Sequence, residues 1–308
     1  MFKGSIVALV TPMKKNGDID FISLKKLINI HISNGTNAIV IGGTTGEAST
    51  LSIPEHYELI EKSIEYSNGK IPIIAGTGSN NTKEAIEWTS EAKRVGSDAC
   101  LIVTPYYNNP TQEGLYKHFK TIADNVDIPQ ILYNVPSRTG YSIEIDIVKK
   151  LSNHKNIIGI KEASGNLEYC ARLLEVLPDD FFVYSGDDAT ALDLMLLGGE
   201  GNISVTANIL PKEMAKLCEL GLRGEYENAL LISKNIASLN NVLFCESNPI
   251  PIKWALGQLG LIDEGIRLPL TTLNKDQQTY VSLIMKEHKK SLLELATPRS
   301  SFMLGLQS

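Results

Sequence analysis

Cysteine is scarce in this sequence, and the residues that occur form no recognisable pattern. Cys100, Cys170, Cys218 and Cys245 lie far apart, so the chain has neither the CxxC spacing of metal and redox sites nor a dense disulfide framework. The five histidines are scattered and form no pair at metal-ligand spacing. We therefore expect the cysteines to be reduced and structural.

Long apolar runs and an excess of basic charge are also missing. No apolar stretch approaches the roughly 20 residues that a bilayer span requires, and the apolar stretch at residues 5–10 is too short for the core of a signal peptide. The chain carries 29 Lys and Arg against 35 Asp and Glu, a formal net charge of −6, which is unlike the basic surface of proteins that bind nucleic acid or anionic lipid. We expect a cytoplasmic protein with no nucleic-acid or membrane partner.

Short β-branched runs alternate with amphipathic stretches of helical length. The 308 residues are 43% hydrophobic and 21% charged, an ordinary globular composition. Several of the β-runs are apolar at consecutive positions, as expected where both faces of a parallel sheet are covered. The predicted strands are residues 5–10, 38–41, 71–75, 99–103, 130–133, 157–160, 182–185 and 202–205.

The stretches between these runs read as helices. Residues 21–34, 53–67 and 83–94 carry apolar side chains at spacings of three and four. Eight strand-helix units over about 210 residues favour an α/β fold of the closed (β/α)8 TIM-barrel type. An open Rossmann-like sheet is the alternative, although such sheets more often stop at five or six strands.

The chain divides into a barrel, a helical extension and a tail. We assign residues 1–208 to the barrel and residues 209–295 to a C-terminal helical extension, with helices predicted at 211–221, 225–243 and 249–259. Residues 296–308 mix polar residues, Pro and Gly with isolated apolar residues, which predicts a flexible tail.

The carboxyl end of the sixth run carries a candidate nucleophile. Barrel enzymes place their chemistry at the carboxyl ends of the strands. Lys161 directly follows the apolar run 157–160, and an amine in an apolar pocket is suited to attack a carbonyl and form a Schiff base. Tyr133 ends the preceding run, where its phenol could exchange protons beside Lys161. The alternatives are a lysine that reaches solvent or pairs with a carboxylate, and a tyrosine that seals the core rim.

Other strand ends carry groups that could bind an anion. Thr44 and Thr45 stand among three glycines, where hydroxyls and backbone N–H groups could bind a carboxylate, although a merely tight turn is equally compatible. This motif lacks the GxGxxG and GxxxxGK spacings of nucleotide sites. Arg138 could hold a carboxylate with two donors or form a surface salt bridge. Asp187 and Asp188 have no histidine nearby, so we expect no metal and no cofactor.

Together these motifs resemble the dihydrodipicolinate synthase family, which belongs to the pyruvate-dependent class I aldolases together with N-acetylneuraminate lyase. The resemblance extends from residue 1 to about residue 269 and is specific only in combination. It rests on residues 43–47 (GTTGE), 103–108 (VTPYYN), 133–140 (YNVPSRTG), 159–162 (GIKE) and 185–188 (SGDD).

The resemblance implies roles for particular residues. Lys161 would form a Schiff base with pyruvate, and Tyr133 would act as proton donor and acceptor in a relay with Thr44 and Tyr107. Tyr107 in such enzymes reaches in from the neighbouring subunit. The backbone at Thr45 and at Ile203 would complete the pyruvate pocket, and Arg138 would hold the carboxylate of L-aspartate-4-semialdehyde.

The resemblance also implies an activity and an assembly. The expected enzyme is a lyase (EC 4.3.3.7) that produces 4-hydroxy-tetrahydrodipicolinate for diaminopimelate and lysine synthesis, without cofactor or metal, as a homotetramer built from two dimers. Arg138 favours this activity over that of a sugar-acid lyase such as N-acetylneuraminate lyase. A barrel that has lost catalysis is the third possibility, but Lys161 and Tyr133 are both present.

Some relatives in this family are inhibited by lysine at the interface of the tight dimer. The residues of this chain that match or nearly match that site are Ser49, His56, Asn80, Glu84 and Tyr106. Two positions depart from it, because Ile53 stands where lysine-sensitive relatives usually carry a histidine, and Ala48 replaces a hydroxyl. We predict weakened feedback inhibition by lysine, which an activity curve at millimolar lysine measures.

Overall fold

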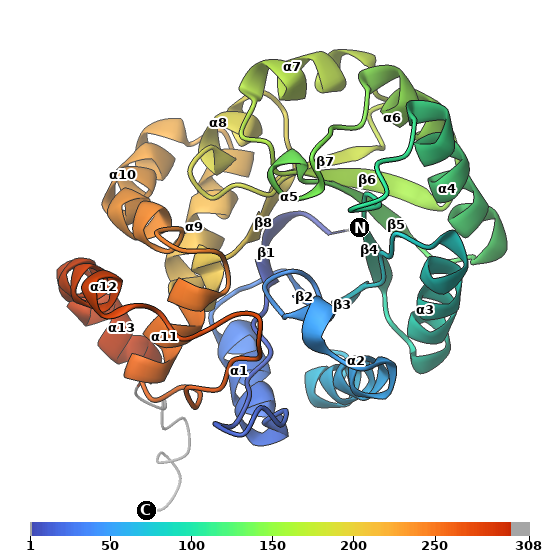
Figure 1. The fold of residues 1–308 in the computed structure, drawn as a ribbon. Helices are drawn as coiled ribbons and strands as arrows, with labels where there is room; N and C mark the ends of the chain where they lie inside the picture. The colour runs from blue at the N-terminus through green and yellow to red at the C-terminus, as the bar shows by residue number, and fades with distance from the viewer. Residues whose placement is uncertain (1, 297–308) are drawn as a thin grey trace, which may run out of the picture.

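The chain folds into a closed parallel barrel surrounded by helices. The computed structural model describes residues 2–296, and Figure 1 shows the strands as a central ring. All eight neighbouring pairs are parallel, and β1 pairs with β8 to close the barrel. The TIM-barrel prediction is confirmed. The strands are β1 (Gly4–Ala8), β2 (Ala38–Ile41), β3 (Ile73–Gly76), β4 (Ala99–Val103), β5 (Gln130–Asn134), β6 (Ile157–Glu162), β7 (Phe182–Ser185) and β8 (Gly201–Ser204).

Helices fill the connections between strands and continue beyond the last strand. The barrel region contains α1 (Phe21–Ser33), η1 (Ala48–Thr50), α2 (Ile53–Ser67), α3 (Thr82–Val95), α4 (Gln112–Asn125), α5 (Pro136–Thr139), α6 (Ile145–Leu151), α7 (Leu167–Val176) and α8 (Ala191–Leu196). After β8 follow η2 (Thr206–Asn208), α9 (Pro211–Leu222), α10 (Tyr226–Val242), α11 (Ile250–Gln258), α12 (Lys275–Glu287) and α13 (Lys289–Ala296).

Local sequence signals explain where the helices begin and end. Ser52 and Glu55 form a capping box at the start of α2, in which each side chain satisfies a backbone N–H of the other residue. The helix ends at Asn68, which adopts a left-handed conformation with φ 47°. Gly96 ends α3 in the same conformation with φ 97°, which glycine adopts without a steric penalty.

The region after β8 contains more helix than the sequence pattern predicts. The predicted helices at 211–221, 225–243 and 249–259 correspond to α9, α10 and α11, and the structure adds α12 and α13. Helix α9 packs on β1 and beside α8, so it completes the ring around the barrel, while α10 packs on α9 and α12. The boundary of the helical extension at residue 209 stays a prediction.

The core has two layers. One apolar cluster fills the barrel interior and includes Ile6, Val40 and Ile203, and the other lies between the strands and the outer helices and includes Ile39 and Ile41. Successive residues of a strand therefore face opposite clusters, and both are buried. This arrangement explains the consecutive apolar residues of the predicted strands.

A bulge interrupts this alternation in β6. The pairing register shifts between Gln130 and Ile131, because Gln130 pairs with Ile157 while Ile131 pairs with Gly159. Ile158 is the extra residue and belongs to the interior cluster. Beyond the bulge, Tyr133 pairs with Lys161 and both occupy the interior side of the barrel. The bulge thus decides which face of the sheet the lysine takes.

The described residues end at Ala296, the last residue of α13. Residues 297–308, which make up nearly all of the predicted flexible tail, lie outside the described residues. Within residues 2–296, no helix is long and apolar enough to span a membrane.

Candidate functional site

A cavity opens at the carboxyl ends of the strands. It encloses about 380 Å³, and its walls include Thr44 from the loop after β2, Tyr133 from β5 and Arg138 from α5. Trp88 and Tyr106 form another part of the wall. Groups that the sequence places at two separate strand ends therefore meet at one cavity, as expected for a barrel enzyme.

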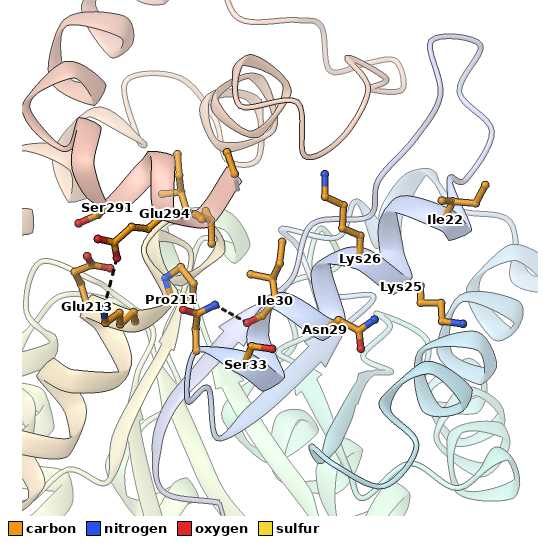
Figure 2. Close-up of a pocket in the computed structure, with 15 residues that line it drawn as sticks. Ile22, Lys25, Lys26, Asn29, Ile30, Ser33, Pro211, Glu213, Ser291 and Glu294 are labelled. Atoms are coloured by element: carbon orange, nitrogen blue, oxygen red, sulfur yellow. Dashed lines mark hydrogen bonds and ion pairs between the residues drawn. The ribbon is translucent and has the colours of Figure 1, made fainter. Parts of the chain in front are cut away.

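A larger cavity lies elsewhere on the molecule, between α1, α9 and α13. It encloses about 720 Å³, and Figure 2 shows its charged walls, with Lys25 and Lys26 on α1 and with Glu213 and Glu294 on the opposite helices. None of the candidate site residues lines it. Its size alone does not make it the catalytic site.

Lys161 and Tyr133 are neighbours inside the barrel. The Lys161 Nζ atom lies 4.3 Å from the centroid of the Tyr133 ring. The lysine is 5% exposed and the tyrosine 7% exposed, and Tyr133 rather than Lys161 lines the cavity. Lys161 belongs to none of the ion pairs found within residues 2–296. Its side chain thus neither reaches solvent nor pairs with a carboxylate.

Gly186, in the turn after β7, lies directly against the stem of Lys161. A Cβ atom added to Gly186 would lie 2.7 Å from Cε and 3.0 Å from Cγ of Lys161, and 2.6 Å from Cβ of Ala163. These separations are well below van der Waals contact. The motif that ends the seventh predicted strand contains this glycine, but only the structure shows that the absence of a side chain makes room for the lysine.

The loop after β2 is anchored by residues from the far end of the chain. The Asn248 Nδ2 atom donates a hydrogen bond of 2.9 Å to Oγ1 of Thr45. Glu47, which is buried and has φ 55°, forms an ion pair with Lys253 of α11 and accepts a hydrogen bond from the backbone N–H of Arg267. Burial lowers the pKa of Lys253, and the Glu47 carboxylate opposes this effect. No sequence motif pointed to Asn248, Lys253 or Arg267.

Arg138 sits at the rim of the cavity. It is exposed, and its Nη2 atom donates a hydrogen bond of 3.0 Å to the backbone oxygen of Asn248. It forms no salt bridge with any residue that the structure describes. The guanidinium is therefore oriented by a carbonyl and not neutralised by a carboxylate, which leaves its charge available to an anionic substrate.

Tyr107 is the candidate catalytic residue that the single chain does not bring to the site. Its side chain is 96% exposed, its backbone has φ 75°, and it does not line the cavity. The neighbouring Tyr106 does line the cavity. An aromatic side chain in this position contacts the site of its own chain only through a rearrangement, or it serves a second copy.

Ile203 and Asp188 are both buried and are held by structural contacts. Ile203 is buried in β8, within the same interior cluster as Tyr133. The Asp188 carboxylate accepts hydrogen bonds from Nδ2 of Asn202 and from the backbone N–H groups of Val205 and Thr206, at 2.7 to 3.0 Å. This carboxylate holds the turn after β8, on which the Ile203 backbone depends.

The residues of the possible regulatory site only partly share the cavity. Ser49 and Tyr106 line it, as does Ala48. His56 is buried against Trp88, its Nε2 atom donates to the backbone oxygen of Gly76 at 2.8 Å, and burial lowers its pKa.

Asn80 and Glu84 lie outside the cavity wall. The Asn80 Nδ2 atom donates to the backbone oxygen of Tyr106 at 3.0 Å, and Glu84 accepts from the Ser79 hydroxyl at 2.8 Å. Ile53 is half exposed and offers no polar atom in its side chain.

Comparison with known proteins gives consistent matches over most of the chain. The Dihydrodipicolinate synthetase family matches residues 1–288. The 4-hydroxy-tetrahydrodipicolinate synthase of Pseudomonas syringae pv. syringae is 57% identical over 275 residues, covering 89% of this chain and 94% of that protein.

Solved structures match equally well. The chloride-inhibited dihydrodipicolinate synthase from Acinetobacter baumannii, complexed with pyruvate, superposes with a TM-score of 0.93 at 54% identity, covering 94% of this chain and 99% of that one. A DHDPS from Cyanidioschyzon merolae with lysine bound has a TM-score of 0.91 at 40% identity, covering 94% of this chain and 98% of that one.

Proposed function

The chain belongs to the dihydrodipicolinate synthetase family, and we propose that the cavity at its barrel mouth condenses pyruvate with L-aspartate-4-semialdehyde through a Schiff base on Lys161. The activity is that of a 4-hydroxy-tetrahydrodipicolinate synthase, a lyase of lysine and diaminopimelate biosynthesis, as in relatives that share more than half of its residues. No observation favours the sugar-acid lyase or the non-catalytic barrel.

The observation that carries the proposal is the buried pair of Lys161 and Tyr133. An amine that is removed from water and from carboxylates can attack the ketone carbon of pyruvate, and loss of water then gives the imine. Removal of a proton from the methyl carbon gives an enamine, which attacks the aldehyde carbon of the second substrate. Tyr133, whose ring centroid lies 4.3 Å from the amine, would transfer protons in these steps.

The carboxylate groups of the substrates need donors at fixed positions. The Thr45 and Ile203 backbones would hold the pyruvate carboxylate, and Thr45 is itself held by Asn248. Arg138 lines the same cavity with no carboxylate partner and would bind the carboxylate of L-aspartate-4-semialdehyde. Both substrates are thus oriented by groups at the ends of different strands.

Tyr107 supports a dimer as the smallest active unit. We infer that it completes the relay with Tyr133 and Thr44 in a second copy, because it is almost wholly exposed and does not line the cavity of its own chain. A homotetramer built from two such dimers is the assembly that we propose, in the cytoplasm.

We also propose that the part of the cavity wall formed by Ser49 and Tyr106 binds lysine. The structure of a relative with lysine bound supports it, and Ser49 and Tyr106 share a cavity wall with Tyr133. Ile53 and Ala48 lack polar side-chain atoms, so binding would be weaker than in relatives with a histidine and a hydroxyl there.

The decisive experiment combines turnover with trapping of the imine. Consumption of both substrates is measured by coupling to a dihydrodipicolinate reductase and NADPH, and borohydride reduction in the presence of pyruvate is followed by mass spectrometry. Lys161→Ala should abolish turnover and the adduct, and Tyr107→Phe should slow turnover by about 10²-fold, as expected for a lost proton-transfer group.

The matched control is Lys155→Ala. Lys155 is exposed and pairs with Asp127 on the surface at the other end of β6, so its loss should leave turnover unchanged. Turnover that survives in Lys161→Ala, or an adduct on a different lysine, would refute the assignment of the nucleophile. Trapping of pyruvate without turnover of L-aspartate-4-semialdehyde would refute the second substrate.

A further inference from the structure

A buried carboxylate follows the candidate nucleophile along the chain, on the opposite face of the sheet, and takes no part in the proposed chemistry. Glu162 is 2% exposed and follows Lys161 in β6, and its partner Asn134 in β5 is completely buried. Burial of a carboxylate carries a desolvation cost unless it accepts several hydrogen bonds. This residue therefore needs a reason to be present.

Every polar group of this pair has a partner. The Asn134 Nδ2 atom donates to Oε1 of Glu162 at 2.8 Å, and the Asn134 Oδ1 atom accepts from the backbone N–H of Ile143 at 3.1 Å. Glu162 also accepts from the Ser164 backbone N–H at 3.1 Å and from the Ser164 hydroxyl at 2.8 Å. The Cys170 thiol lies 3.6 Å from Oε2. The carboxylate thus joins β5, β6 and the turn after β6.

The position of the pair in the sheet couples it to the site. Tyr133 pairs with Lys161 across the two strands, and the next residues, Asn134 and Glu162, pair with each other. Because successive residues point to opposite faces, one pair lies inside the barrel and the other lies behind it. The bulge in β6 lies only a few residues before this point and makes the local register less constrained by the ladder alone.

We propose that the Asn134–Glu162 hydrogen bond is a positioning clamp that sets the distance and orientation between the Lys161 amine and the Tyr133 phenol. The clamp fixes the strand register where the catalytic pair projects, and it holds the turn that carries the chain away from Lys161. Neither residue touches the reacting atoms. This inference rests on the proposed function, because it assigns a role only if Lys161 forms the imine.

The hydrogen-bond pattern supplies a test with a built-in rescue. In Glu162→Gln, one side-chain oxygen becomes an amide nitrogen, which donates and does not accept. This nitrogen must face either the Asn134 amide N–H or the Ser164 N–H and hydroxyl, so one hydrogen bond is replaced by two opposed donors. In the double variant Asn134→Asp and Glu162→Gln, the new aspartate accepts from Ile143 and from the new amide, while the glutamine oxygen accepts from Ser164. The hydrogen bonds between the two strands, to Ile143 and to one side-chain oxygen from Ser164 are then restored, with the charge moved to the other strand, and only the second branch of the Ser164 N–H, to Oε1, is lost.

The expected result is a loss and a recovery in rate. Glu162→Gln should slow imine formation with pyruvate by about 10-fold or more, as expected when reacting groups lose their alignment, and the double variant should recover most of the loss. Both rates are measured by quench-flow with borohydride as the quencher. The temperature is kept well below the thermal unfolding midpoint of each variant. Should Glu162→Gln fail to fold, Ser164→Ala removes a single donor from the exposed side of the clamp and should give a smaller loss of the same kind.

The matched control lies at the opposite end of the same strand. Asn156 is buried just before β6, and its Nδ2 atom donates to the backbone oxygen of Ala123 at 3.0 Å. Asn156→Asp should lower stability without slowing imine formation, because that end of the barrel carries no catalytic group. A similar loss of rate in this variant would show that general destabilisation is responsible and would overturn the clamp.

The outcomes separate the clamp from the function on which it rests. An adduct at Lys161 in the wild type with an unchanged rate in Glu162→Gln would overturn the clamp alone. A loss that the double variant does not recover would overturn hydrogen bonding as its basis. Absence of any pyruvate adduct in the wild type would instead contradict the proposed function, and the clamp with it.

Discussion

A single missing side chain gives Lys161 its place in the barrel. The lysine stem passes Gly186 so closely that a methyl group there would overlap with it and with Ala163. Gly186 does not have a positive φ, unlike the glycines of several turns. Its requirement is therefore one of space at the catalytic lysine and not of backbone conformation.

Gly186→Ala should displace the lysine while leaving the fold intact. We expect imine formation with pyruvate to slow by about 10-fold or more, because the amine moves away from its aligned position. The rate of borohydride trapping measures the effect. Gly257→Ala is the control, since its added Cβ would meet Glu264 at an ordinary 3.6 Å; equal rates in the two variants would refute the steric role of Gly186.

At the level of whole elements, the helices after β8 hold the loop that carries the candidate residues Thr44 and Thr45. The loop after β2 carries Thr44 and Thr45, and it is held by Asn248 before α11 and by Lys253 within α11. These partners are separated along the chain by about 200 residues. The helices after β8 therefore position the wall of the candidate site and do not merely cover the barrel.

Removing one member of the buried ion pair should be costly. Lys253→Met leaves the Glu47 carboxylate buried without a cation, which should lower the free energy of unfolding by about 3–5 kcal/mol. Urea denaturation measures the change. The double variant Lys253→Met and Glu47→Gln should recover part of the loss, because glutamine still accepts from the Arg267 N–H. A loss below about 1 kcal/mol in the single variant would contradict this account.

The molecule as a whole carries three buried histidines, His31, His56 and His118, whose lowered pKa makes its stability dependent on pH. Burial lowers the pKa of His31 to about 3 and that of His118 to about 4, from an ordinary value of 6.5. Each Nδ1 atom lies 2.9 Å from a threonine hydroxyl, of Thr36 and Thr82 respectively. Because these folded-state values are depressed, the unfolded chain binds more protons below pH 6.5, and stability falls as the pH drops toward 4.

His118→Asn should make this decline shallower. Asparagine keeps a polar atom near the Thr82 hydroxyl but does not titrate, so the protein should lose less stability between pH 6.5 and pH 4.5 than the wild type does. Denaturant unfolding at several pH values gives the slope of the free energy of unfolding against pH for the wild type and for His118→Asn. Thr82→Val should lower stability at each pH without removing the histidine contribution. Identical slopes in the wild type and His118→Asn would contradict the predicted linkage.

The sequence by itself determined the fold class and the candidate catalytic pair. The apolar periodicity of the β-runs and amphipathic stretches indicates which residues face the core. This periodicity is visible in each segment without knowing which segments it packs against. The carboxyl ends of the runs then indicated Lys161 and Tyr133 before any geometry was known. Helix α12 was missed, although its buried residues Val281, Ile284 and Met285 stand at the helical spacing of three and four, so the sequence does carry a signal for it.

Only the tertiary structure decided how these residues meet. Strict alternation from Ile158 would turn Lys161 away from the barrel interior, and the bulge in β6 reverses this outcome. The partners of Glu162 and Glu47 likewise depend on strand register and on chain closure, which no local pattern encodes. The apolar pattern is a property of a single segment and can be read from the sequence. A contact is a property of two segments and exists only once the barrel has closed.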